Sequence, residues 1–184
     1  MAIRQLVTAE ELERMGSPDF GYELVRGNLV PVTPAGRERG ALTAFLIAEL
    51  SLFVRPRALG RVYNELGFQL FTNPDTVRAP DVSFVSRDRE AAFRGRRGFV
   101  TGVPDLAVEI VSFDKAVAEV SVKAADYLEA GTPLVWVVDP HSRQVMVYQP
   151  GQAVTTLSAA DTLDGADVLP EFTLPLSRLF AELD

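Results

Sequence analysis

Apolar residues recur at helical spacing in two parts of the first third of the chain. Between about residues 38 and 54 they stand three or four positions apart, until Pro56 ends the pattern. Before that, Thr8-Ala-Glu-Glu11 has the spacing of a capping box and predicts a short helix that ends near Met15. We therefore expect one short and one long helix in this region.

Two more helices are predicted further along. Residues 115–130 carry an apolar stripe, with Asp114 placed to cap the first turn and Gly131 placed to end the last one. A final helix is predicted over residues 176–183.

The rest of the chain is patterned as strands. Two short extended runs around Arg26-Gly27 predict a β-hairpin. Longer apolar runs predict strands at residues 61–71, 76–86, 104–112, 133–139 and 143–148. The hydrophobic pattern is continuous and has no repeat, so we expect a single domain over residues 1–184. The order of elements predicts a mixed α/β fold, in which helices cover the faces of a mixed β-sheet.

The amino-acid composition excludes several classes of metal site and catalytic site. The 184 residues include no cysteine, which excludes a disulfide scaffold, a zinc finger, an iron–sulfur cluster and a thiol nucleophile. The only histidine, His141, follows Asp139-Pro140 at a predicted turn, where a surface position is favoured over a general-base role. A metal site would therefore have to be built from oxygen ligands.

The net charge of −7 argues against a general nucleic-acid coat or a protein that binds anionic membranes, although a local basic groove remains compatible with it. No segment approaches the ~20 apolar residues that a membrane span needs. The first residues turn acidic where a signal peptide would be apolar. We therefore expect a cytoplasmic protein.

Two acidic residues lie on predicted neighbouring strands. Asp81 begins one strand, and Glu109 lies between Val108 and Ile110, where an unpaired carboxylate is costly to bury. Two such acids are the minimum for a hard divalent cation such as Mg²⁺. An alternative without metal is that Asp81 is a turn residue and that Glu109 pairs with a nearby arginine.

Lys123 is one of only two lysines, against 16 arginines. It lies beside the apolar stripe of the third predicted helix, from which its ammonium can reach the sheet edge and stabilise charge on a phosphate. The alternative is an exposed pair with Glu119, worth about 0.3–0.5 kcal/mol.

Several segments in order along the chain carry a family resemblance: YELVRGNLV, GFQLF, TVRAPDVSFVSRDR, PDLAVEIVS, KAADYLEAGTPLVWVVDP and LDGADVLPEFTLPLSRLF. Together they resemble the bacterial Uma-two family of restriction-endonuclease type, within the PD-(D/E)XK nuclease superfamily, from about residue 8 to residue 182. The resemblance implies a restriction-endonuclease-like core, a mixed β-sheet flanked by helices, with an acidic metal site at one end.

The resemblance also implies which residues form the site. Asp81 matches the aspartate of the superfamily and Glu109 its second acid, so these two would bind Mg²⁺ or Mn²⁺. The lysine that usually follows the second acid by two positions is replaced by Val111. Lys123 stands where the lysine of this family is thought to have moved.

The resemblance also bears on three further acidic residues as candidates for the site. Glu23 matches a family glutamate expected near the site, which implies a catalytic residue that would complete the metal shell directly or through water, and Glu65 is a weaker candidate. Asp105, in the second Pro-Asp dipeptide, competes with Asp81 for the role of the superfamily aspartate, and the family segment favours Asp81.

The chain departs from the family at two places. Arg39 occupies a position that often holds histidine, and Ser112-Phe113-Asp114 replaces the usual Ser-Pro-Ser or Ser-Pro-Asn. Both changes lie near the expected site entrance, where they would alter or weaken activity.

The function implied is metal-dependent hydrolysis of DNA phosphodiester bonds, with Lys123 positioning the nucleophile or the phosphate. An alternative is a weak or inactive nuclease-fold module that binds nucleic acid or a protein partner. DNA would be held by local arginines, although a solvated surface segment explains them equally well. They are Arg87, Arg89, Arg94, Arg96 and Arg97, and separately Arg55, Arg57 and Arg61.

A third alternative is a purely structural or interaction protein. Trp136, Phe99 and Phe113 are large apolar residues that could serve an interface, although Trp136 is better explained as core. Because many restriction-type nucleases act as dimers, we expect a homodimer.

Overall fold

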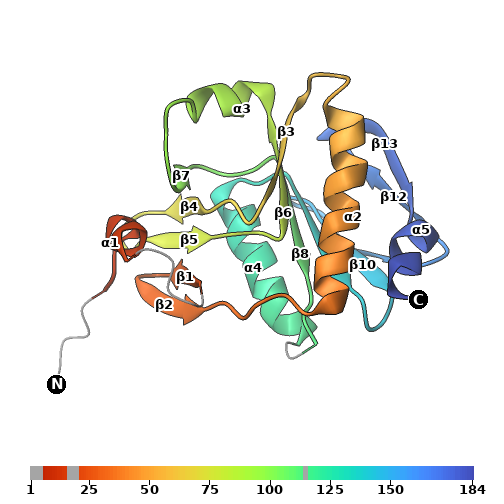
Figure 1. Ribbon diagram of the computed structural model, residues 1–184, viewed down its shortest axis with the longest axis horizontal. Helices are drawn as coiled ribbons and strands as arrows, with labels where there is room; N and C mark the ends of the chain where they lie inside the picture. The colour runs from red at the N-terminus through yellow and green to blue at the C-terminus, as the bar shows by residue number, and fades with distance from the viewer. Residues whose placement is uncertain (1–5, 16–20, 114–115) are drawn as a thin grey trace.

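The computed structural model describes residues 6–15, 21–113 and 116–184. The largest sheet in this part of the chain has six strands, in the order β11-β10-β9-β8-β6-β3 (Figure 1). Only β8 and β9 run parallel; the other neighbours are antiparallel. The strands are β3 (Gly60–Asn64), β6 (Val82–Ser86), β8 (Leu106–Ile110), β9 (Leu134–Asp139), β10 (Gln144–Tyr148) and β11 (Thr155–Ser158).

Two helices cover opposite faces of this sheet. α2 (Arg37–Val54) buries Leu42, Leu46, Leu50 and Val54 against a core that includes Val108 and Trp136. α4 (Val117–Ala130) packs on the other face, against Ala107, Val135 and Val137. Because both faces are covered, β8 and β9 are buried along their whole length, which explains their nearly continuous apolar sequence. Trp136 is fully buried, as expected, and so is unavailable to an interface.

A second sheet of five strands lies beside the first, in the order β2-β1-β5-β4-β7 (Figure 1). It contains the predicted hairpin, and the predicted N-terminal helix, α1 (Ala9–Arg14), begins with the expected capping box between Thr8 and Glu11. The strands are β1 (Tyr22–Val25), β2 (Asn28–Pro31), β4 (Phe68–Phe71), β5 (Thr76–Arg78) and β7 (Val100–Thr101).

Two strands predicted as continuous are each divided between the sheets, so those two predictions were wrong. Residues 61–71 form nearly all of β3 and then β4, and residues 76–86 form β5 and then β6. The first break contains Glu65 in a left-handed conformation, with φ of 48°. The second contains Pro80, which has no N–H to donate to a ladder. The second break places the end of β5 beside the start of β6, where the candidate site lies.

The remaining elements include the predicted C-terminal helix and one helix, α3 (Arg87–Ala92), that was not predicted. They are α3, the hairpin of β12 (Thr162–Gly165) and β13 (Leu169–Pro175), α5 (Leu176–Phe180) and a 3₁₀ turn at Ala181–Leu183. α4 ends as predicted at Gly131, whose φ is 103°, and it begins at Val117; the predicted start and cap at residues 114 and 115 lie outside the described residues. None of the described helices combines the length and the apolar character needed to cross a membrane.

Candidate active site

Asp81 and Glu109 lie side by side at one end of β6 and β8. These strands are antiparallel with Val82 opposite Val108, and one further step along this register brings Asp81 beside Glu109. The Ile110 N–H donates to Asp81 Oδ2 at 2.7 Å. Both acids are almost completely buried, with exposed fractions of 2% for Asp81 and 3% for Glu109.

Lys123 joins Glu109 to Glu23, which comes from β1 of the second sheet. The Lys123 Nζ donates to Glu23 Oε1 at 2.8 Å and to Glu109 Oε2 at 3.0 Å. α4 presents this side chain because Val120 and Ala124, on either side of Lys123, anchor the helix on the sheet. The alternatives of a Glu119–Lys123 pair and a Glu109–arginine pair are not what the structure contains; the partner of Glu109 is Lys123.

Three more residues complete the network, and the sequence analysis missed them. Arg78 donates to Glu23 Oε2 at 2.8 Å and, through Nε, to Asp126 Oδ2 at 3.0 Å. The Tyr127 hydroxyl donates to Glu109 Oε1 at 2.9 Å. Asp126 and Tyr127 follow Lys123 by three and four positions, a spacing that places side chains on one helix face and could have indicated them.

Arg39, in the first turn of α2, lies directly against Asp81. Its Nε donates to Asp81 Oδ1 at 2.6 Å, and its terminal nitrogens lie 3.7 Å from Glu65 Oε1 and 3.5 Å from the Thr33 carbonyl oxygen. The Arg39 side chain is 11% exposed and that of Glu65 is 55% exposed. Glu65 therefore lies on the outer side of Arg39 and does not contact the inner acids.

A small cavity of about 120 Å³ opens onto this network and is lined by Glu23, Arg39, Glu109 and Lys123, among others. A larger hollow of about 440 Å³ adjoins it and is lined by Arg37, Arg39, Ser112 and Phe113, among others. Arg39 borders both. Phe113, from the second family departure, is 98% exposed beside the outer hollow.

Burial, helped by neighbouring carboxylates, shifts the pKa of Glu109 upward. Burial, together with the nearby Asp81 and Glu23 carboxylates, raises the pKa of Glu109 from 4.5 to about 7, although Lys123 opposes this. Burial would also raise the pKa of Glu23, but Lys123 and Arg78 outweigh it and lower that pKa. Burial would lower the pKa of Lys123, but Glu109 and Glu23 raise it above its ordinary value. Lys123 is therefore an ammonium at neutral pH.

The raised pKa of Glu109 predicts a pH dependence of stability. The folded protein keeps a proton that the unfolded chain releases near pH 4.5, so the contribution of Glu109 to the free energy of unfolding falls by about 3 kcal/mol between pH 4.5 and 7. Urea denaturation of wild type and Glu109→Gln across pH 5–8 measures this, because the variant lacks the titrating group. The same substitution at the exposed Glu182 should leave the pH slope unchanged; an equal slope in wild type and Glu109→Gln would contradict the prediction.

The donor set fits a hard divalent cation that keeps much of its shell as water or phosphate. Among the described residues, no three Asp, Glu or His side chains gather closely enough to form a protein-only metal cage. Asp81 and Glu109 are nevertheless adjacent carboxylates whose mutual repulsion a cation would relieve. Mg²⁺ and Mn²⁺ suit two carboxylates supplemented by solvent.

The comparisons with known proteins agree with this architecture. A family named Uma2 and described as "Putative restriction endonuclease" matches residues 9–177, which include the whole network above. The chain belongs to the Uma2 family. The predicted resemblance is confirmed by this match.

A solved structure supports the fold of this Uma2 member. A protein from Anabaena variabilis, described as a putative nuclease belonging to DUF820, matches with a TM-score of 0.82 and 22% sequence identity. The match covers 97% of this chain and 99% of the other, so the predicted mixed α/β fold is confirmed. Comparison with functionally curated proteins gave no match.

Of the competing candidates, Asp105 lies away from this Uma2 site, whereas His141 borders a pocket that shares Ser112 and Phe113 with the outer hollow. Asp105 precedes β8 and therefore lies at the opposite end of that strand from Glu109; its carboxylate pairs with Arg89 and accepts the Ser86 N–H. His141 is exposed at the turn after β9, as predicted.

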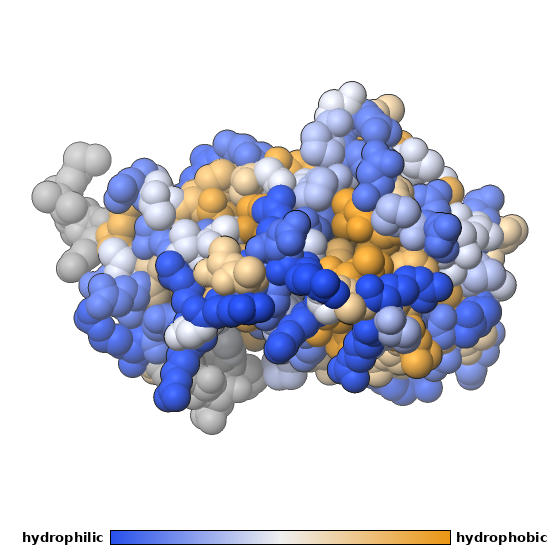
Figure 2. All heavy atoms as spheres, turned by 90° about the horizontal axis from the view of Figure 1, so that it is seen from above, coloured by the Kyte–Doolittle hydropathy of each residue, from blue (hydrophilic) through white to orange (hydrophobic). Residues whose placement is uncertain are grey.

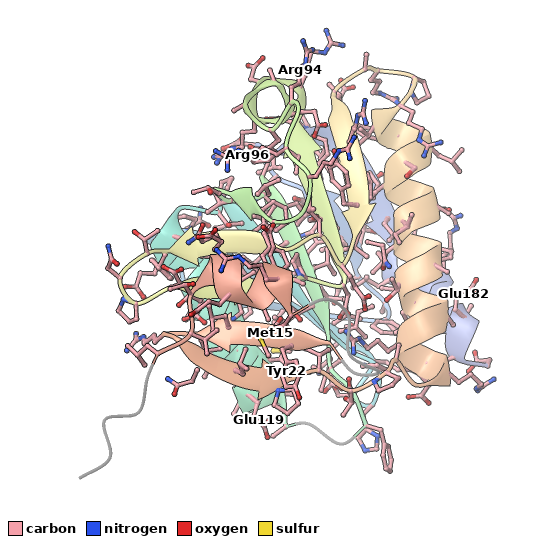
Figure 3. The ribbon with its side chains drawn as sticks, turned by 60° about the vertical axis from the view of Figure 1, so that its left-hand side comes forward. Met15, Tyr22, Arg94, Arg96, Glu119 and Glu182 are labelled. Atoms are coloured by element: carbon pink, nitrogen blue, oxygen red, sulfur yellow. The ribbon has the colours of Figure 1, made fainter. Side chains whose placement is uncertain are left out.

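The arginines expected to hold DNA gather at the other end of the molecule. Arg94 and Arg96 lie at the opposite end from Glu119, which lines the inner cavity (Figure 3). Figure 2 looks onto this far end, where α3 and the last turn of α2 lie, and shows hydrophilic side chains gathered across it. Arg89, Arg61 and Arg87 are partly engaged, with Asp105, Glu90 and the Ala58 carbonyl respectively. These arginines do not border the cavity at Lys123, whereas Arg37 borders the adjoining hollow.

Proposed function

We propose that this Uma2-family chain hydrolyses phosphodiester bonds of DNA with the help of Mg²⁺ or Mn²⁺. The observation that carries the proposal is the convergence of Glu23, Glu109 and Lys123 at one cavity, from β1, β8 and α4, with Asp81 beside Glu109 just before β6. Buried acids paired with a buried ammonium are uncommon in a core, and a cluster of perturbed titratable groups at a cavity is typical of a functional site. The family match supports a nuclease over other metal-dependent hydrolases.

Asp81 and Glu109 would hold the cation. When bound, a divalent cation lowers the pKa of a water ligand and offsets negative charge on the phosphate. Glu109 would bind it as a carboxylate, so metal loading releases the proton that its raised pKa retains below about pH 7.

Lys123 acts as a fixed positive charge. Because Glu23 and Glu109 raise its pKa, it stays protonated at neutral pH and cannot accept a proton from the attacking water. Its hydrogen bonds to Glu23 and Glu109 hold the ammonium at the cavity, where it can donate to a phosphate oxygen or orient the nucleophile. Glu23 is a positioning residue for Lys123, because both its oxygens already accept from Lys123 and Arg78.

The DNA next to the cleaved bond would be contacted from α2. Arg37 and Arg39 both lie in the first turn of this helix and border the outer hollow. The arginines at the far end, about 27 Å away along α2, could contact phosphates only on another part of a longer duplex. The net charge of −7 makes such local contacts necessary.

The test of this function is nicking of supercoiled plasmid by purified protein with Mg²⁺, with Mn²⁺ and with EDTA. We expect nicking with either metal and its loss in EDTA, restored by excess metal. A preparation passed through the same purification from cells lacking the gene controls for contaminating nucleases. Absence of nicking under all metal conditions would overturn the proposal.

The second candidate function is a nuclease-fold module that binds DNA without cleaving it. The ion pair between Arg39 and Asp81 favours it, because the guanidinium occupies one oxygen of a proposed metal ligand. Gel-shift measurements on the same protein distinguish the two: binding without nicking in Mg²⁺ or Mn²⁺ supports the module.

A further inference from the structure

We propose that Arg39 is an internal counter-ion that competes with the divalent cation for Asp81, and that metal binding moves its guanidinium outward to Glu65. This inference rests on the proposed metal site at Asp81 and Glu109. It assigns to Arg39 a regulatory role over that site. Arg39 is therefore a positioning residue that sets the metal affinity.

The contacts of Asp81 show the competition. Its Oδ2 accepts a hydrogen bond from the Ile110 N–H at 2.7 Å, whereas the hydrogen bond of Oδ1 comes from a side chain. That oxygen is the one to which Arg39 donates, through Nε at 2.6 Å and also through a terminal nitrogen. A cation that binds Asp81 through Oδ1 must share this oxygen with the guanidinium or displace it.

The charges make sharing unfavourable. Arg39 is a permanent cation, because a guanidinium stays protonated in proteins, and it lies between Asp81 and Glu65. A divalent ion at Asp81 would meet this full positive charge within a few ångströms, in a site where the Arg39 side chain is only 11% exposed. Repulsion at that distance is weakly screened.

Glu65 is a second acidic residue with which the Arg39 guanidinium can pair. A terminal nitrogen already lies 3.7 Å from Glu65 Oε1, on the outer side of the site. The Glu65 side chain is 55% exposed whereas that of Arg39 is 11% exposed, so movement toward Glu65 takes the guanidinium toward solvent. Glu65 should therefore stabilise the metal-bound arrangement by pairing with the displaced arginine.

The experiment measures Mn²⁺ binding to metal-free protein by titration calorimetry and by the electron paramagnetic resonance of free Mn²⁺, without DNA. Arg39→Gln should bind Mn²⁺ on the order of tenfold more tightly than wild type, because the competing charge is gone. Arg39→Lys, which keeps the charge but not the planar fork, should lie between the two. Glu65→Gln should bind about threefold more weakly than wild type, because the displaced Arg39 loses its outer partner.

Two control variants give reference points for Mn²⁺ binding: one should bind like wild type and one should not bind. Arg178→Gln removes an arginine that pairs with Glu49 and borders neither cavity, and it should leave Mn²⁺ affinity unchanged. Asp81→Asn should lose the binding altogether. Glu65→Gln alters a half-exposed side chain, so it decides the question even if Arg39→Gln does not fold.

The outcomes separate this inference from the proposed function. If wild type binds Mn²⁺ at Asp81 as tightly as Arg39→Gln, or if Glu65→Gln binds no more weakly than wild type, the competition is refuted and the metal site stands. If neither wild type nor any Arg39 variant binds Mn²⁺, the metal site is refuted, and this inference with it. The expected ranking is Arg39→Gln tightest, then Arg39→Lys, wild type and Glu65→Gln.

Discussion

Asp81→Asn and Lys123→Met are each expected to bring metal-dependent plasmid nicking close to background, a loss on the order of 10²–10³-fold. Asp81→Asn removes one of the two carboxylates proposed to hold the cation. Lys123→Met removes the ammonium held between Glu23 and Glu109 while keeping most of the side-chain volume. Initial nicking rates in Mg²⁺ and Mn²⁺ measure both effects.

Folding of these variants is checked by circular dichroism and thermal unfolding. Lys123→Met should stay folded near pH 6, because Glu109 can remain protonated there and needs no counter-charge. Asp105→Asn is a matched control: it makes the same substitution in the other Pro-Asp dipeptide, at the opposite end of β8 from Glu109, and should retain nicking. Wild-type rates in Asp81→Asn or Lys123→Met would refute the assigned roles.

Arg78→Met is expected to lower the free energy of unfolding by about 3–5 kcal/mol, the largest effect on stability that we predict. Arg78 is 5% exposed and pairs with both Glu23 and Asp126, so its removal leaves two carboxylates short of a cation in a region with little water. Urea denaturation at pH 7 measures the change.

The matched control for this variant is Arg143→Met. Arg143 pairs with Asp184 at the surface, where the arginine side chain is 46% exposed and the aspartate 66% exposed. Loss of such a pair changes stability by about 0–1 kcal/mol. Equal effects of the two substitutions would mean that the buried network does not support the fold in the way its geometry indicates.

The sequence predicted most of the helices and much of the site. Apolar spacing and capping residues predicted α2, the N-terminal helix with its Thr8–Glu11 cap and the end of α4 at Gly131, because these features depend on neighbouring residues along the chain. The cost of burying a charge singled out Glu109, and the scarcity of lysine drew attention to Lys123. The structure brings these two residues into contact.

Only the tertiary structure decided how the strands are divided and how each charge is paired. Pro80 marks where the run from residue 76 to residue 86 breaks, but it does not show that the two parts join different sheets, because a strand in either sheet has the same alternation of side chains. That change sets Arg78 at the end of β5, where it pairs with Glu23 from β1 and Asp126 from α4, and sets Asp81 just before β6, beside Glu109.

The partners of the buried acids could not be read from the chain for the same reason. Arg39 is 42 positions from Asp81, and Lys123 is 100 positions from Glu23. Ion pairs act through space, and no local pattern encodes which of the 16 arginines meets which acid. The sequence thus determined which residues could carry the chemistry. The packing of two sheets against α2 and α4 decided that they meet, and that Arg39 lies against Asp81.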